Sequence, residues 1–153
     1  MTTGDAESSG ATGAPENTAG EPLLTPPAAT ALAVGVDLVE QERLVRTWER
    51  FGDRFLHKVF TATELEQAQG RIDQLVGRFA AKEACAKALG VGIGKIQWRD
   101  IEIVRLPSGK PALRLHGAAV EHARRLGLTA FDVSITDTQT LTMAVVVGVG
   151  VSR

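Results

Sequence analysis

The segment 77–90 restricts the possible folds of this chain more than any other. Apolar residues recur at helical spacing up to Phe79 and a glycine closes the segment, so residues 72–89 are predicted to form one amphipathic helix. Extending the apolar line by four residues, and then by four more, reaches Glu83 and Lys87. The pattern therefore places a carboxylate and an ammonium group on the core-facing side of a helix.

Charged groups on a core-facing line have two explanations. Burying a charge is costly unless it is paired or binds a metal. Glu83 and Lys87 could form a simple i, i+4 ion pair at the edge of the core, worth about 0.2–0.5 kcal/mol. Alternatively, Glu83 is a metal-binding carboxylate among cations that face phosphate, and Arg78 and Lys82 supply two further cations on the neighbouring face. The helix by itself leaves both explanations open.

The net charge of −1 argues against a generic nucleic-acid-binding protein. Residues 1–30 contain four acidic residues and no basic ones, so residues 31–153 carry 17 basic and 14 acidic groups. That mild positive excess is compatible with an anionic partner. The single cysteine, Cys85, cannot form an internal disulfide, and it is expected to be a small buried residue in a cytoplasmic protein.

The chain is expected to fold as one domain that follows a disordered tail. Residues 1–30 are rich in Gly, Ala, Thr, Ser, Pro and Glu, and their apolar bulk is too small to offset the entropy cost of ordering them. Residues 31–153 have a length that suits a single core. No apolar run approaches transmembrane length and no signal-peptide pattern opens the chain, so no membrane association is expected.

Apolar periodicity predicts the remaining secondary structure. The predicted strands cover 31–39, 101–106, 112–115, 131–135 and 141–147, and the predicted helices cover 40–50, a short segment opened by a Thr61–Glu64 capping box, 72–89 and 117–126. Phe51 and Leu126 are expected among the core residues. An early strand followed by helices and two hairpins predicts an α+β domain, with helices packed on an antiparallel-rich sheet.

Asp37 is an acidic residue inside an apolar strand, where aspartate is generally depleted. The strand could end at this residue, or Asp37 could cap the following helix. A third possibility is that Asp37 and Glu83 meet in the fold. Together they would supply hard oxygen ligands for Mg²⁺, which is typically bound by one or two carboxylates along with phosphate oxygens and waters.

Four motifs, in this order, resemble holo-[acyl-carrier-protein] synthase, the short, single-domain type of 4′-phosphopantetheinyl transferase. They are the segments 35–40, 54–61 with Glu64, 77–90 and 109–111. The Lys-Glu-Ala-x-x-Lys-Ala core with an upstream Gly-Val-Asp is a specific combination. The resemblance covers about residues 32–148.

The resemblance implies transfer of 4′-phosphopantetheine from coenzyme A to a serine of an apo acyl carrier protein of fatty-acid, polyketide or peptide synthesis, with release of 3′,5′-ADP. It implies Asp37 and Glu83 as Mg²⁺ ligands, and Glu83 and Lys87 as the catalytic groups. The residues expected to bind coenzyme A are Arg78, Lys82, Lys87, Gly109, Lys110, Pro111 and Asp137. Those expected to receive the acidic carrier protein are Arg43, Arg50 and Arg54. The resemblance also implies a homotrimer with active sites between subunits.

Asp137 departs from the family pattern, which usually has a histidine there, near the 3′-phosphate of coenzyme A. A carboxylate would repel that phosphate. Either another cation such as Lys110 or Arg114 compensates, or affinity falls, or the donor differs.

Two other functions compete with the transferase. Sets of Asp, Glu and Lys also occur in the active sites of metal-dependent phosphodiesterases and nucleases. The near-neutral net charge, and the lack of a run of basic residues interspersed with aromatic ones, argue against that function. A non-catalytic module that binds carrier proteins is the other alternative, with Asp137 marking a lost nucleotide site. The presence of Asp37, Glu83 and Lys87 argues against such a module.

Overall fold

The computed structural model describes residues 18–19 and 30–151, and the tail predicted over residues 1–30 falls almost wholly outside these described residues. Strands β1 (Thr30–Glu40), β5 (Leu141–Val151) and β4 (Leu128–Asp137) form an antiparallel sheet in the order β1-β5-β4, and β2 (Ile101–Arg105) pairs with β3 (Pro111–Leu115) in a separate antiparallel hairpin. The helical elements are α1 (Gln41–Val59), α2 (Ala62–Ala68), α3 (Ile72–Ala88), the 3₁₀ turn η1 (Trp98–Asp100) and α4 (Gly117–Arg125). The predicted α+β class is confirmed.

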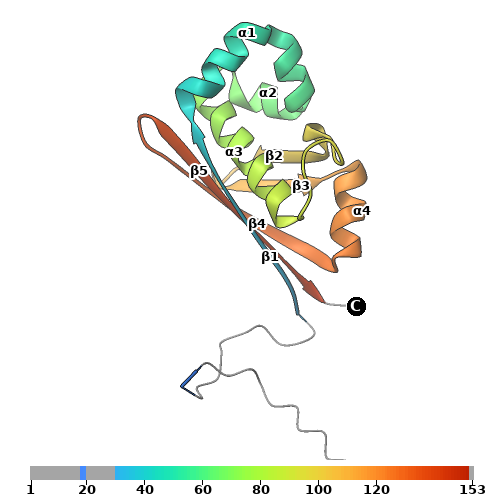
Figure 1. Ribbon diagram of the computed structural model, residues 1–153. Coiled ribbons are helices and arrows are strands. Elements are labelled where there is room, and N and C mark those ends of the chain that lie inside the picture. Colours follow the sequence, from blue (N-terminus) through green and yellow to red (C-terminus); the bar gives the residue numbers. More distant parts are fainter. Residues whose placement is uncertain (1–17, 20–29, 152–153) are drawn as a thin grey trace, which may run out of the picture.

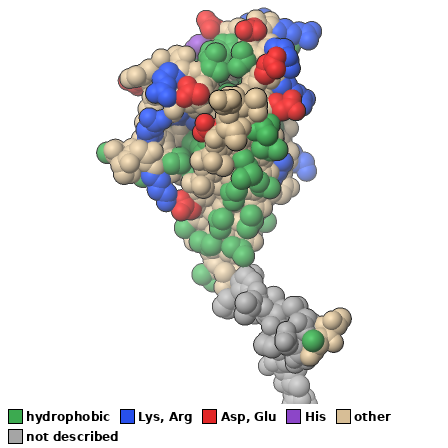
Figure 2. Space-filling view, turned by 90° about the vertical axis from the view of Figure 1, so that its left-hand side faces the viewer, with side chains coloured by type: hydrophobic (Ala, Val, Ile, Leu, Met, Phe, Trp, Pro, Cys, Tyr) green, Lys and Arg blue, Asp and Glu red, His purple; other side chains and the backbone are tan. Residues whose placement is uncertain are grey.

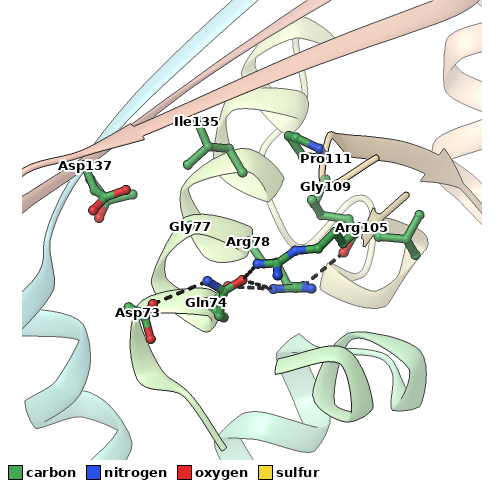
Figure 3. A pocket seen from close by; sticks show the side chains of 12 residues that line it. Asp73, Gln74, Gly77, Arg78, Arg105, Gly109, Pro111, Ile135 and Asp137 are labelled. Atoms are coloured by element: carbon green, nitrogen blue, oxygen red, sulfur yellow. Dashed lines mark hydrogen bonds between the residues drawn. The ribbon is translucent and has the colours of Figure 1, made fainter. Parts of the chain in front are cut away.

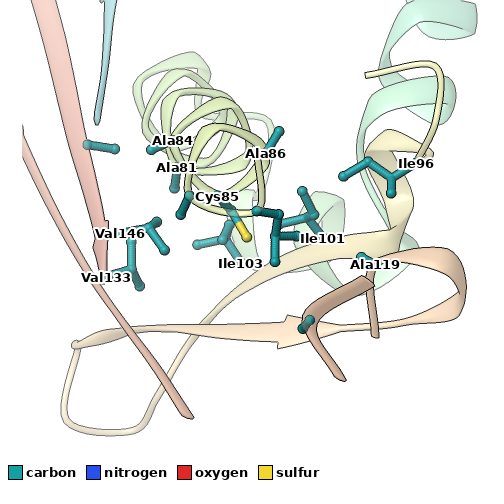
Figure 4. Packing of buried hydrophobic residues seen from close by; sticks show 14 of the residues in the cluster. Ala81, Ala84, Cys85, Ala86, Ile96, Ile101, Ile103, Ala119, Val133 and Val146 are labelled. Carbon is teal, nitrogen blue, oxygen red and sulfur yellow. The ribbon is translucent and has the colours of Figure 1, made fainter. Parts of the chain in front are cut away.

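Helix α3 is the centre of the domain, because it lies between the three-stranded sheet and the β2–β3 hairpin (Figure 1). Its small residues Ala81, Ala84 and Cys85 are fully buried and contact apolar side chains from both sheets (Figure 4). Burial raises the pKa of the Cys85 thiol to about 12. The prediction of a small buried cysteine is therefore confirmed, and this thiol is not a nucleophile at neutral pH.

A glycine in β1 allows the strand to lie directly against α3. A Cβ atom on Gly35 would come within 1.9 Å of the Ala84 carbonyl oxygen and 2.6 Å of the Ala88 nitrogen. No side chain fits there, so only glycine permits this backbone approach. The close contact brings Asp37, two residues later in β1, next to the C-terminal half of α3.

Two predicted core residues are exposed instead. Helix α1 continues to Val59 across a kink at Gly52, whose φ of 59° lies in the left-handed region. Phe51 stands at this kink, where it is 55% exposed and the Arg50 guanidinium lies 5.1 Å from its ring centroid. Leu126 is 44% exposed because it follows α4, beyond the last buried residue of that helix, Ala123.

None of the helices within residues 30–151 is both long and apolar enough to span a membrane.

Candidate functional site

Asp37 lies on the face of β1 that packs against α3. Side chains of a strand alternate between its two faces, so Asp37 shares the inner face with Gly35 and Val39, whereas Val36 and Leu38 point outward. The Asp37 side chain is only 14% exposed. The strand continues to Glu40, so Asp37 neither ends it nor caps α1.

The partner of Asp37 is Lys87, from the last turn of α3. The Lys87 ammonium donates to Asp37 Oδ1 at 2.7 Å and to the Val36 carbonyl oxygen at 3.0 Å. This hydrogen bond raises the pKa of Lys87, and the group stays accessible because its side chain is 53% exposed. Lys87 therefore pairs with a residue of another element, and not with Glu83 along the helix, which was one of the two explanations open from the sequence.

Glu83 lies close to this pair. Burial is the main cause that raises the pKa of Glu83, the nearby Asp37 carboxylate raises it further, and Lys87 opposes both. Asp37 and Glu83 also line the same cavity, so the two carboxylates face a common space. The structure therefore brings together Asp37, the acid inside an apolar strand, and Glu83, the acid on the core-facing line of a helix.

Asp37 and Glu83 line one cavity of about 500 Å³ between β1, α1 and α3. Arg43 reaches the same cavity from α1. The rest of its wall is largely apolar, and consists of Leu38, Val39, Leu44, Phe55, Phe79, Trp98 and Leu141, with Glu40 and Thr47. We call this space the carboxylate cavity.

The carboxylate cavity suits Mg²⁺ rather than a softer metal. Asp37 and Glu83 supply hard oxygen donors, and Mg²⁺ usually takes only one or two carboxylates, with water and phosphate oxygens completing its octahedron. Within residues 30–151 no group of three or more His, Cys, Asp or Glu side chains gathers as a complete metal cage. The donor set thus fits an ion that also needs ligands from a phosphate substrate.

Two other arginines of α1, Arg50 and Arg54, lie further along the helix from the carboxylate cavity. Arg50 and Arg54 line a hollow of about 430 Å³ together with Phe51, Phe55 and Lys58. Phe55 lines both this hollow and the carboxylate cavity. The structure therefore places Arg43 at the carboxylate cavity and Arg50 and Arg54 at a second hollow that shares Phe55 with it.

A second cavity of about 200 Å³ contains several residues predicted to bind coenzyme A (Figure 3). Arg78, Gly109, Pro111 and Asp137 all line it, with Arg105 and Gln74 among their neighbours. Asp137 stands on β4, across the cavity from the Arg78 and Arg105 side chains (Figure 3).

Arg78 and Lys110 differ in how they present their charge. Arg78 is only 4% exposed and its guanidinium donates to the carbonyl oxygens of Ile103 at 3.1 Å and Gln74 at 3.0 Å. Lys110 forms an exposed ion pair with Asp132 at 2.8 Å and does not line the second cavity. Arg114, the other cation considered as a substitute for the family histidine, does not line it either.

The comparison with protein families decides the class of this chain. The model of the 4′-phosphopantetheinyl transferase superfamily matches residues 33–145, which include both cavities. The chain belongs to this superfamily.

Individual members of the superfamily match over most of their length. The holo-[acyl-carrier-protein] synthase of Solibacter usitatus is 41% identical over 120 residues, covering 76% of this chain and 96% of that protein. The crystal structure of holo-[acyl-carrier-protein] synthase from Neisseria meningitidis superposes with a TM-score of 0.70 at 34% identity, covering 76% of this chain and 96% of that one. The Helicobacter pylori synthase in complex with coenzyme A gives a TM-score of 0.67 at 31% identity, covering 78% of this chain and 99% of that one. This chain is therefore a phosphopantetheinyl transferase by family.

Sequence reasoning missed two features of this transferase. Trp98 stacks on Phe79 with ring centroids 4.9 Å apart, and both rings form part of the wall of the carboxylate cavity. Lys82, predicted to bind coenzyme A, is instead fully buried, and its ammonium pairs with the equally buried Glu64 at 2.8 Å. The sequence signals at Glu64 were its place in a family motif and its role in the capping box, which forms as predicted, and neither pointed to Lys82. The partner of Lys82 could not be found because it lies on another helix.

Proposed function

We propose that this chain transfers 4′-phosphopantetheine from coenzyme A to a serine of an apo acyl carrier protein and releases 3′,5′-ADP, in a reaction that requires Mg²⁺. The observation that carries the proposal is the meeting of Asp37 and Glu83 in one cavity, with the Lys87 ammonium 2.7 Å from Asp37 and Arg43 on the cavity wall. That arrangement combines hard oxygen ligands with cations, as diphosphate chemistry needs.

Asp37 and Glu83 would hold the metal, and Lys87 would serve the diphosphate. When bound, Mg²⁺ would supply positive charge against the diphosphate oxygens. The Lys87 side chain is half exposed while it contacts Asp37, so its ammonium is accessible to a substrate phosphate at this cavity. There its ammonium would stabilise the charge that develops on the phosphoryl oxygens.

The nucleophile belongs to the carrier protein. Its serine oxygen attacks the phosphorus that bears the pantetheine arm, the bond from that phosphorus to the oxygen of the departing 3′,5′-ADP breaks, and the serine proton passes to Glu83 directly or through a water. Glu83 suits this role by its position, because it lines the same cavity as Asp37 and Arg43.

The second cavity would receive the nucleotide end of coenzyme A. Gly109 and Pro111 bring the β2–β3 turn to its edge, and the Arg78 guanidinium is held at its wall. Lys110, between those two turn residues, can reach an anion only by leaving Asp132. Lys82 has no such access, because it is 0% exposed in this conformation, so we assign it no direct contact with coenzyme A.

The acyl carrier protein would dock on the basic face of α1. Arg43, Arg50 and Arg54 provide charge complementarity to an acidic protein. Because Arg43 lines the carboxylate cavity, a partner on this face would deliver its serine beside the two acids. A cytoplasmic location, where such carrier proteins and coenzyme A would meet this chain, remains a prediction.

The outer face of the three-stranded sheet supports the predicted homotrimer. Leu32, Val34, Val36 and Leu38 of β1 are 49–60% exposed, and Met143, Val149 and Val151 of β5 are also exposed. They form a continuous apolar surface (Figure 2). Exposed apolar patches of this kind mark association surfaces. Because Asp37 lies in the same strand, association through this face would place a neighbouring subunit next to the site.

Intact-mass measurement of an apo acyl carrier protein tests the proposal. The carrier is incubated with this protein, coenzyme A and Mg²⁺, with one control in EDTA and another using Asp37→Ala. We expect a metal-dependent gain of one phosphopantetheine arm that both controls abolish. No gain on several carriers that another transferase can modify would reject the proposal.

A further inference from the structure

The buried Lys82–Glu64 pair contacts a residue of the carboxylate cavity wall, because the Lys82 ammonium donates to the Trp98 carbonyl oxygen. Lys82 precedes Glu83 in α3, yet neither Lys82 nor Glu64 of α2 lines either cavity, and both side chains are 0% exposed. A buried ion pair is a weak contributor to stability, because desolvation of the two charges offsets much of their attraction. The role of this pair is therefore indicated by the groups that it contacts rather than by its contribution to stability.

The Lys82 ammonium holds the backbone around η1. It donates hydrogen bonds to the Trp98 carbonyl oxygen at 3.1 Å and to the Ile101 carbonyl oxygen. Its third N–H faces Glu64 Oε2, which lies 2.8 Å from the Lys82 nitrogen. All three ammonium donors are thus used. The two carbonyls lie at the start of η1 and at the start of β2, so Lys82 fixes this turn to α3.

Glu64 ties the same ammonium to two more elements. Its Oε2 accepts from the Thr61 backbone nitrogen at 2.8 Å, and its Oε1 accepts from the Ile103 nitrogen at 2.9 Å. The carboxylate therefore links the start of α2 to β2 while it holds Lys82. Charge-assisted bonds in a water-free setting are short and directional, so they hold geometry well.

The turn fixed in this way carries part of the cavity wall. Trp98 stacks on Phe79 with an interplanar angle of 27°, and both rings face the carboxylate cavity beside Glu83. We propose that Lys82, held by Glu64, is a positioning residue that fixes the Trp98–Phe79 wall against Glu83. The inference rests on the proposed function for its effect on turnover, but the position of Trp98 can be measured without any reaction.

The experiment uses the full chain with Trp48→Phe, which leaves Trp98 as its single tryptophan, because the chain has two. In this background, Glu64→Gln with Lys82→Met removes both charges and keeps an acceptor for the Ile103 nitrogen. A matched control, Glu121→Gln with Arg124→Met, removes an exposed ion pair of α4 with a similar separation of 2.8 Å. Cooperative thermal unfolding confirms that each variant is folded.

Acrylamide quenching of Trp98 fluorescence is the first measurement. We expect the quenching constant to rise at least twofold in the double variant and to stay unchanged in the control. With coenzyme A and an apo carrier, we expect kcat to fall by about tenfold to a hundredfold, as for a small misplacement near reacting groups, and KM for coenzyme A to change less than about threefold.

The outcomes separate the two claims. A folded double variant with unchanged quenching, or with increased quenching and unchanged kcat, overturns the positioning role. If the double variant fails to unfold cooperatively, Glu64→Gln alone decides by the same criteria, with smaller changes expected. If the wild-type chain shows no transfer to any carrier, the proposed function fails, while Trp98 quenching still decides whether Lys82 and Glu64 fix the wall.

Discussion

Replacing Gly35 with alanine should damage both stability and the site. The new Cβ would lie 1.9 Å from the Ala84 carbonyl oxygen, and ordinary contact begins at 3.4 Å, so β1 and α3 must separate by about 1.5 Å at this point. Both contacting atoms at Ala84 and Ala88 belong to the backbone, so no side chain can rotate away. Asp37 is two residues further along β1 and must move with it.

The size of the effect follows from this displacement. Overpacking of a core costs about 1–3 kcal/mol, which corresponds to a fall in Tm of roughly 4–12 °C for a domain of this size. A shift of about 1 Å in a positioning element can cost about a hundredfold in rate. The Lys87–Asp37 contact of 2.7 Å would lengthen with the same movement.

Calorimetry and the carrier-protein assay measure both effects for Gly35→Ala. Gly92→Ala is the matched control, because a Cβ at Gly92 meets nothing within 4 Å. We expect Gly92→Ala to keep nearly the wild-type Tm and kcat. A Gly35→Ala variant with the same Tm and turnover as this control would refute the claim that close approach of β1 to α3 builds the site.

Three further predictions concern the acids, the basic face and the apolar face. Glu83→Gln should abolish turnover while coenzyme A binding, measured by calorimetry, partly survives, and an active variant would contradict the assignment of Glu83 as base. Because the folded-state pKa of Glu83 is raised, its ionisation opposes folding at high pH. The metal-free Glu83→Gln variant should therefore have a higher Tm than the wild type at pH 8. This difference in Tm should disappear as the pH falls through the folded-state pKa of Glu83. Arg54→Ala should raise KM for the carrier about tenfold at low salt and less at high salt, with KM for coenzyme A unchanged. Arg124→Ala on α4 is the control. An equal rise in KM for both variants would contradict docking of the carrier on α1. If the chain forms the proposed trimer, Val34→Asp on the outer sheet face should convert it into monomers in sedimentation experiments, whereas a wild-type chain that sediments as a monomer would reject the assembly.

Local patterns in the sequence predicted most of the secondary structure. The Thr61–Glu64 capping box forms as expected, and α3 ends at Ala88 with Leu89 as its C-cap, followed by Gly90, whose φ of 67° is the left-handed conformation expected of a helix-ending glycine. Such signals act within a few residues, so they survive whatever the rest of the chain does. The kink at Gly52 was not foreseen, and for that reason Phe51 was wrongly assigned to the core.

Residue order alone indicates which residues are chemically out of place: Asp37 in an apolar strand, and Glu83 and Lys87 on a core-facing helical line. Their partners depend on how elements distant in the sequence pack together. Lys87 pairs with Asp37 rather than with its helical neighbour Glu83, because Gly35 lets β1 lie against α3. Lys82 resembles a ligand-binding cation in sequence. In the fold it forms an ion pair with Glu64 of α2, and Lys82 is buried away from solvent. Residue type and spacing fix which charges exist along an element, whereas only the packing of elements distant in sequence fixes which charges meet and which remain open to a substrate.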